Sequence, residues 1–158
     1  MDQVNRKVVL GLGNLLFGDE GFGIHALRVL QARHGAQFQV EWADGGVLGL
    51  NLLPLIEECS HLLVLDAVDA GRPAGALVEM ARDEIPLYAG AKMSEHQVGF
   101  QEVLAIAKFR GYYPAYLHLV GVQPADLSTG INLSPAVTAA LPAAVRRAAA
   151  ILQDWFSS

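Results

Sequence analysis

The sequence VVLGLGNLLFGDEGFG at residues 8–23 carries the strongest structural signal in this chain. A run of β-branched and leucine side chains that ends in glycine is typical of an interior strand of a parallel sheet. Two adjacent acids, Asp19 and Glu20, follow in a glycine-rich loop, and a helix is expected directly after them. Open α/β folds bind their ligands at the carboxyl ends of the strands. The two acids are therefore expected at a ligand-binding edge of a sheet.

The length and composition of the chain limit its class. At 158 residues, it is expected to form a single domain over residues 1–158. The hydrophobic share of 53% is high and the charged share of 17% is low, which suggests strands that are hidden on both faces. The net charge of −5 argues against a nucleic-acid partner, because a phosphate backbone would be repelled.

Cysteine use and hydropathy point to a cytoplasmic protein. The single cysteine, Cys59, excludes an internal disulfide framework and a zinc site built from several cysteines. No apolar run approaches the roughly 20 residues that span a bilayer. The polar segment 1–7 does not read as a signal peptide. We therefore expect no membrane association, and a monomer, because nothing in the sequence demands a dimer.

Strand and helix patterns alternate along the chain. Apolar runs and alternation predict strands at 7–12, 37–42, 62–65, 76–81 and 116–122. Helical spacing predicts helices at 21–33, at 48–59, from 95 onward and from 135 onward, and Asp44-Gly45-Gly46 is expected to form a turn. This order predicts a three-layer α/β/α fold with a five-stranded, mostly parallel sheet.

One strand is expected to run against the others. Only a short loop separates the strands at 62–65 and 76–81, whereas a parallel crossover needs a dozen or more residues. The later strand therefore either pairs antiparallel with the earlier one or runs in reverse elsewhere in the sheet.

Gly11-Leu12-Gly13 suggests a dinucleotide-binding loop, but its surroundings argue against one. The third glycine of that fingerprint would stand where this chain has Leu16. Glu41 lies at about the right distance for a ribose contact, yet Asp19 and Glu20 would repel a pyrophosphate. We interpret the glycines as a tight turn that needs their backbone freedom.

Glu20 and Asp66 are the most informative pair of acids. Both follow apolar strands, and neighbouring parallel strands place their carboxyl ends side by side. Glu20 and Asp19 would also suit the first turn of a helix, where acids are favoured. Asp66 is harder to explain in that way, because a carboxylate at the end of four apolar residues costs solvation free energy unless it is paired or bound.

His96 is a candidate third metal ligand beside Glu20 and Asp66. Ser94-Glu95-His96-Gln97 has the spacing of a capping box, which would place His96 in the first turn of a helix. The helix dipole disfavours the imidazolium there and leaves a neutral ring that can bind a metal. One histidine and two carboxylates suit a divalent transition metal such as nickel or zinc.

The other candidate residues carry weaker signals. Asp44 points toward the same sheet edge, either as a turn residue or as an acid that supports the ligands. Asp19 is a second acid of that supporting kind. Cys59 lies on the apolar face of a helix and is expected in the core. Structural roles are expected for the remaining histidines, which are His25, His34, His61 and His118.

With these residues in view, the chain resembles the hydrogenase maturation endopeptidases, the processing proteases of [NiFe]-hydrogenases. The resemblance covers nearly the full length. It rests on five segments in the right order and spacing, which are GLGNLL with DEGFG at 11–23, Asp44-Gly45-Gly46, Asp66-Ala67, Ser94-Glu95-His96-Gln97 and LVGVQP at 119–124. The family often has Thr after Asp-Gly-Gly, where this chain has Val47.

The resemblance implies a five-stranded α/β/α fold and a site in which Glu20, Asp66 and His96 hold the metal and carry catalysis. It also implies the substrate, which is the nickel-loaded precursor of a hydrogenase large subunit that loses a short C-terminal peptide. The Ni²⁺ is then the substrate's own, and other divalent cations are expected to substitute. Whether the metal or a carboxylate activates the attacking water stays open.

Two other functions remain in competition. A non-catalytic nickel-binding module or chaperone would use the same ligands without truncating the precursor. A peptidyl-tRNA hydrolase shares the opening Gly-Leu-Gly-Asn, but Leu15 follows Asn14 where that family has proline, and its Arg-His-Asn run is absent.

Overall fold

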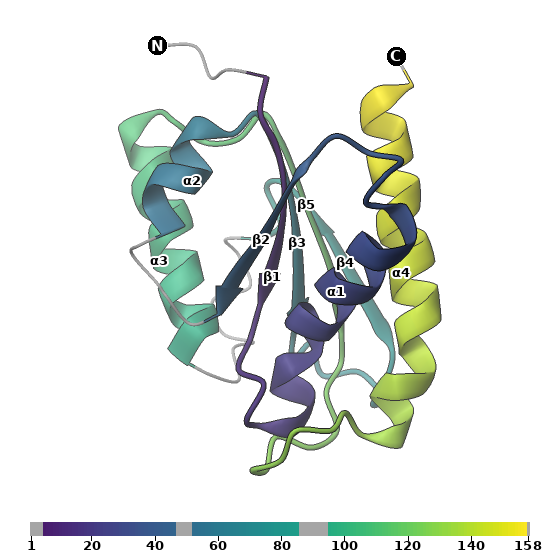
Figure 1. Cartoon of the computed structure of the whole chain (residues 1–158). Coiled ribbons are helices and arrows are strands. Elements are labelled where there is room, and N and C mark those ends of the chain that lie inside the picture. The colour runs from purple at the N-terminus through teal and green to yellow at the C-terminus, as the bar shows by residue number, and fades with distance from the viewer. Residues whose placement is uncertain (1–4, 47–51, 86–94, 158) are drawn as a thin grey trace.

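The computed structural model describes residues 5–46, 52–85 and 95–157, and for residues 95–99 it describes the backbone alone. Figure 1 shows the arrangement of the elements. In chain order these are β1 (Lys7–Leu12), the 3₁₀ turn η1 (Gly18–Gly21), α1 (Phe22–His34), β2 (Glu41–Gly46), α2 (Leu53–Glu58), β3 (His61–Ala67), β4 (Leu77–Ala81), α3 (Glu95–Arg110), β5 (Tyr116–Val122) and α4 (Pro135–Phe156).

The strands form one five-stranded sheet in the order β2-β1-β3-β5-β4. The first four strands are parallel, and β4 runs antiparallel to β5. This confirms the predicted fold class. It also shows where the reversed strand lies, because β4 pairs with β5 and not with β3. The short loop after β3 therefore passes the end of β5, and β4 then runs back along the outer side of β5. This connection avoids the long crossover that a parallel pair needs.

Helices cover both faces of the sheet, as predicted for a three-layer domain. Side chains alternate along β3, so that Leu62 and Val64 join the cluster with α2 and α3, whereas Leu63 and Leu65 join the cluster with α1 and α4. Figure 1 shows α2 and α3 on one side of the sheet and α1 and α4 on the other. The interior strands are apolar over their whole length because both of their faces are buried.

Two predicted elements differ from the structure around β2. The strand expected at 37–42 begins only at Glu41, and the turn expected at Asp44-Gly45-Gly46 lies inside the same strand. Pairing with β1 sets these bounds, since Val8 lies opposite Glu41 and Gly11 lies opposite Asp44. Phe38 is buried against α1 and α4, so the alternating pattern reflected packing and not a ladder of hydrogen bonds.

The helix predicted at 48–59 is shorter than expected where the structure describes it. α2 spans Leu53–Glu58 and carries Pro54 in its first turn, where the missing N–H of proline leaves no helical hydrogen bond unmade. The predicted residues 48–51 lie outside the described ranges. Cys59 follows the helix and is fully buried, as expected for a core residue.

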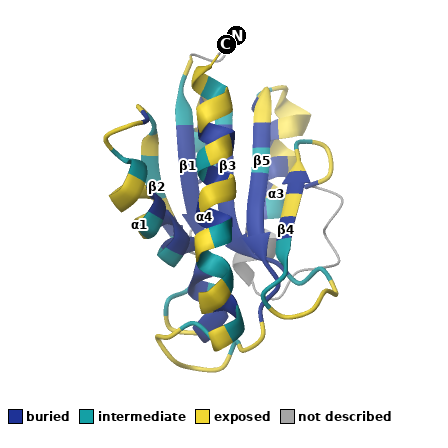
Figure 2. Cartoon of the chain, turned by 90° about the vertical axis from the view of Figure 1, so that its right-hand side faces the viewer, coloured by how far each residue is buried: buried dark blue, intermediate teal, exposed yellow. Residues whose placement is uncertain are grey.

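α4 is the longest helix of the described chain and begins as predicted. The Ser134 hydroxyl accepts a hydrogen bond from the Val137 N–H, and Pro135 occupies the first helical position. By length and composition the helix could cross a membrane. Its buried stripe packs against the sheet, however, and Figure 2 shows buried and exposed residues alternating along it. The apolar stripe of α4 is therefore part of the core on this face of the sheet.

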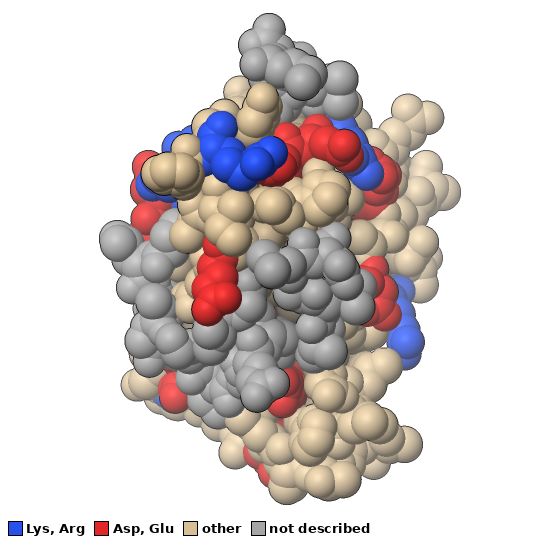
Figure 3. Space-filling view, turned by 90° about the vertical axis from the view of Figure 1, so that its left-hand side faces the viewer, with Lys and Arg blue, Asp and Glu red and all other residues tan. Residues whose placement is uncertain are grey.

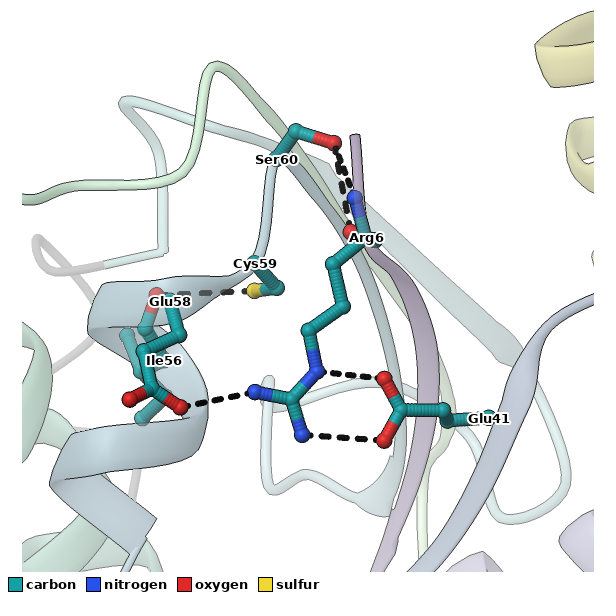
Figure 4. A network of polar contacts seen from close by, with 6 residues as sticks. All are labelled: Arg6, Glu41, Ile56, Glu58, Cys59 and Ser60. Carbon is teal, nitrogen blue, oxygen red and sulfur yellow. Dashed lines mark hydrogen bonds and ion pairs between the residues drawn. The ribbon is translucent and has the colours of Figure 1, made fainter. Parts of the chain in front are cut away.

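Charged contacts tie together the amino ends of β1 and β2 and the end of α2. Figure 3 shows acidic and basic side chains gathered at the upper end of the face that α2 and α3 cover. The Arg6 guanidinium binds both carboxylate oxygens of Glu41 and, at 2.8 Å, a carboxylate oxygen of Glu58 (Figure 4). The hydrogen bonds from Arg6 lower the pKa of Glu41. This network stabilises the end of the molecule opposite to the candidate site.

Candidate active site

The candidate site lies at the carboxyl ends of the parallel strands. β1 ends at Leu12, and η1 then carries Asp19 and Glu20 to the start of α1. Figure 1 shows this edge at the lower end of the molecule, where α1, α3 and α4 all begin. The helix starts and strand ends therefore meet at one edge, as the sequence predicts for a ligand-binding site in this fold class.

Two glycines allow this edge to be compact. A Cβ atom at Gly23 would lie 2.1 Å from the Leu12 carbonyl oxygen and 2.2 Å from the Leu65 carbonyl oxygen. A Cβ at Gly13 would lie 2.0 Å from the carbonyl oxygen of Glu20. Only glycine permits these approaches. They bring η1 and the first turn of α1 against the ends of β1 and β3, the strand that carries Asp66.

Asp19 is fully buried and has an anchoring role that the sequence did not reveal. Its carboxylate accepts hydrogen bonds from the N–H groups of Ala125 (2.8 Å) and Asp126 (2.9 Å). It also accepts from the N–H (2.7 Å) and the hydroxyl (2.8 Å) of Ser134. The N-terminus of α1 has no side-chain cap. Asp19 thus holds the loop before α4, and does not cap the helix that follows it.

Asp66 lies inside β3 and not just beyond it, because the strand continues to Ala67. Its side chain is 2% exposed, and Oδ1 accepts a hydrogen bond from the Ala67 N–H at 2.9 Å. The alternation along β3 places Asp66 on the face covered by α2 and α3, together with Leu62 and Val64. A carboxylate in such apolar surroundings needs compensating partners.

Glu20 and His96 approach the same edge from two other elements. Glu20 is partly exposed in η1, and its N–H donates to the Phe17 carbonyl oxygen at 3.0 Å. His96 is the second residue of α3, which begins at Glu95 as predicted, while the Ser94 cap and the His96 side chain lie outside the described part of the structure. Among the side chains that are described, no three metal-ligating groups cluster. The three-ligand site therefore stays a prediction.

Asp44 is exposed at the end of β2, beside β1. Its Oδ1 accepts a hydrogen bond from the Gly46 N–H at 3.0 Å, which fixes the local turn of the backbone. The Gly46 carbonyl oxygen in turn accepts from the Gly13 N–H at 3.2 Å. Asp44 thus shapes the end of the strand that flanks the glycine loop.

Gln123 organises another part of this edge, and in the sequence it stands out only as part of the LVGVQP motif at 119–124. Its side-chain oxygen accepts from the N–H groups of Ala70 and Arg72, and its amide donates to Asp69 at 3.1 Å. The amide thereby holds the loop that follows β3. A glutamine directly after a predicted strand is the only sequence signal for this role.

Cys59 offers no nucleophile to this site. The thiol is fully buried, and burial raises its pKa to about 12, so that it stays protonated at neutral pH. Its Sγ donates to the carbonyl oxygen of Ile56 in α2. Cys59 lies just before the amino end of β3, whereas the candidate site lies at the carboxyl end of that strand. Thiol-protease chemistry through Cys59 is therefore excluded.

Comparisons with known proteins agree with this architecture. A family model described as hydrogenase maturation protease matches residues 24–151. The hydrogenase expression/formation protein HupD of Rhodobacter capsulatus is 44% identical over 152 residues, which are 95% of this chain and 72% of that protein. The hydrogenase 2 maturation protease of Escherichia coli is 36% identical over 150 residues, covering 94% of this chain and 92% of the relative.

Solved structures lead to the same family. The hydrogenase maturating endopeptidase HybD from Escherichia coli superposes with a TM-score of 0.85 at 31% identity, covering 96% of this chain and 94% of that structure. The resemblance that the sequence motifs suggested is thereby confirmed. The chain belongs to the hydrogenase maturation protease family and is an endopeptidase.

Proposed function

We propose that this endopeptidase removes a short C-terminal peptide from the nickel-loaded precursor of a [NiFe]-hydrogenase large subunit. We further propose that Glu20, Asp66 and His96 bind the nickel ion that the precursor carries. The observation that carries the proposal is the position of Asp66, whose carboxylate is buried near the carboxyl end of β3. The turn η1, which carries Glu20, lies at the same edge of the sheet, and α3, which carries His96, begins there. Membership of the family supports the choice of substrate.

An incomplete ligand shell explains how such an enzyme would act only on a loaded precursor. Three protein ligands leave coordination positions open for groups of the substrate. The shell is complete only when the precursor supplies both the metal and its own ligands. Nickel then acts as a recognition element of the substrate, and other divalent cations are expected to substitute for it.

Two routes for the hydrolytic step fit these residues. In one, Glu20, Asp66 and His96 would hold the nickel ion of the precursor, which would supply a Lewis acid for the scissile carbonyl or the attacking water. In the other, a carboxylate takes a proton from the water directly, in the manner of an aspartic protease. In both routes, water adds to the peptide carbonyl and the leaving amine receives a proton. We propose that the reaction takes place in the cytoplasm, with the enzyme as a monomer.

The test uses purified protein with nickel-loaded and nickel-free precursor, followed by intact-mass spectrometry. We expect truncation of the loaded precursor alone. Glu20→Gln and Asp66→Asn each remove a negative ligand and should lower the rate by about 100-fold. Asp154→Asn, at an exposed position near the end of α4, is the matched control and should cleave normally. Equal cleavage of both precursors, or full activity of the Glu20→Gln, Asp66→Asn double variant, would contradict the proposal.

A further inference from the structure

Three large apolar side chains are exposed beside the candidate site. Leu16 is 60% exposed, Phe17 39% and Ile131 69%. They come from two loops that are far apart in the sequence, and we refer to these three residues as the apolar rim. Exposed apolar side chains that stand singly need no explanation, but a group of them often marks a binding surface.

Hydrogen bonds hold the two loops of the apolar rim together. Gly18 N–H donates to the Gly130 carbonyl oxygen, and Gly130 N–H donates to the Leu16 carbonyl oxygen, each at 2.8 Å. This pair forms a parallel bridge between Phe17 and Gly130. Gly130 directly precedes Ile131, so the bridge fixes both sides of the rim.

A buried anchor lies directly behind the apolar rim. Asp19 receives four hydrogen bonds from the loop that carries Ile131, and its own N–H donates to the Asp126 carbonyl oxygen at 2.9 Å. The exposure of the rim is therefore a property of an ordered, tightly bonded structure. Such a surface loses little conformational entropy when it binds a partner.

The apolar rim continues directly into the candidate site. The Phe17 carbonyl oxygen accepts the N–H of Glu20, so rim and proposed ligand belong to the same turn. Figure 1 shows the two loops of the rim at the lower end of the molecule and the carboxyl-terminal end of α3 toward the upper end. Phe109 belongs to the last turn of α3. Most Lys and Arg side chains visible in Figure 3 also lie toward the upper end.

We infer that the apolar rim binds an apolar segment of the large-subunit precursor next to the bond that is cut. The inference rests on the proposed function for the identity of the substrate. An endopeptidase must hold a polypeptide against its site, and the rim is an exposed apolar surface that the described residues join to Glu20. Because the rim side chains carry no charge, they favour an apolar segment over a basic one. The rim therefore contributes substrate affinity, while Glu20, Asp66 and His96 serve the metal.

Kinetics with aspartate substitutions separate affinity from chemistry. Leu16→Asp and Ile131→Asp place a charge in the proposed contact, and we expect each to raise KM roughly 10-fold or more while kcat stays within about 2-fold. Phe109→Asp is the control, because Phe109 is 93% exposed and distant from the site. Thermal unfolding verifies that the variants are folded, which is expected because both side chains face solvent. Unchanged KM in both rim variants would contradict the inference.

A second measurement does not depend on cleavage. Benzoylphenylalanine is introduced at position 131 or, as a control, at position 109, and the protein is irradiated with purified nickel-loaded precursor. We expect a crosslink to the precursor from position 131 and none from position 109. If the precursor is crosslinked but never cut, the proposed function fails while the rim inference stands. If position 131 crosslinks to a second copy of this chain, or no more than position 109, the rim inference is wrong.

Discussion

The Asp19 carboxylate accepts hydrogen bonds from both the backbone N–H and the hydroxyl of Ser134, the residue that caps α4. These contacts join the turn before α1 to the start of the last helix. The Ser134 hydroxyl accepts from Val137 and donates to Asp19, so one side chain serves both the cap and the anchor. The strand-edge loops are thereby held as one unit.

Removing this anchor should destabilise the whole domain. Asp19→Asn takes away the charge and one of two acceptor oxygens from a fully buried position. We expect the free energy of unfolding to fall by about 2–4 kcal/mol, measured by urea denaturation, because hydrogen bonds to buried charged groups are stronger than average. Ser134→Ala, which keeps the backbone donor, should cost about 1 kcal/mol. A loss below about 0.5 kcal/mol for Asp19→Asn would contradict the anchoring role.

Closure of the site edge depends on Gly23. A methyl group at this position collides with the carbonyl oxygens of Leu12 and Leu65, neither of which can rotate away. Gly23→Ala should therefore cost more than about 3 kcal/mol of unfolding free energy. Gly21→Ala is a milder change for comparison, because a Cβ atom at Gly21 would lie 3.1 Å from its nearest neighbour, the Leu15 Cα atom. We expect about 1 kcal/mol or less for that change, and equal effects of the two would argue against the close approach.

Stability should decrease as the pH falls below about 6.5, the ordinary pKa of histidine. Burial, together with the charge of Arg28, lowers the pKa of His25 in the folded protein. As the pH falls, His25 therefore takes up a proton in the unfolded chain before it does so in the folded protein. The contribution of neutral His25 to the free energy of unfolding is complete above pH 6.5 and is lost as the pH falls through the lowered pKa. The pKa of His61 is also lowered, chiefly because of burial.

Urea denaturation between pH 7.5 and 5.5 checks this dependence. His25→Gln should flatten the profile in part, with His61 accounting for some of the remaining slope. His34→Gln, at the last residue of the same helix, serves as the comparison. An unchanged slope in His25→Gln would show that the protonation of His25 does not differ between the folded and unfolded states.

Proteolysis should survive the loss of the single thiol. Cys59 is buried at the end of the molecule opposite to the candidate site, and its raised pKa keeps it protonated. Cys59→Ala should retain full cleavage of the precursor at a stability cost of about 1–2 kcal/mol for the small cavity. Iodoacetamide applied to the folded protein should likewise leave the rate unchanged. Loss of activity in a folded Cys59→Ala variant would contradict the exclusion of Cys59 from catalysis.

Sequence patterns predicted the interior of the fold better than its edge. The strands Lys7–Leu12 and Tyr116–Val122 have the predicted bounds, because burial on both faces demands continuous apolar runs. The alternation at 37–42 predicts a strand that starts too early, since Phe38 packs against helices and the strand begins only at Glu41. The position of β4 beside β5 was left open, because pairing across the sheet has no local signal.

In the candidate site, too, the sequence predicts the residues that have a local pattern and misses the roles that depend on distant partners. Glu20, Asp66 and His96 stood out because each follows a strand or opens a helix, which is a local pattern. The anchoring role of Asp19 depends on partners at positions 125, 126 and 134, more than a hundred residues away, and only the folded chain brings them together. Long-range polar contacts of this kind leave no periodicity in the sequence.

The central claim is that Glu20, Asp66 and His96 bind one metal ion at the sheet edge. The most direct measurement is anomalous diffraction at the nickel edge, from crystals of the protein soaked with Ni²⁺. We predict a single strong peak within coordination distance of a Glu20 oxygen, an Asp66 oxygen and a His96 ring nitrogen. A peak on other residues, with none at these three, would contradict the account.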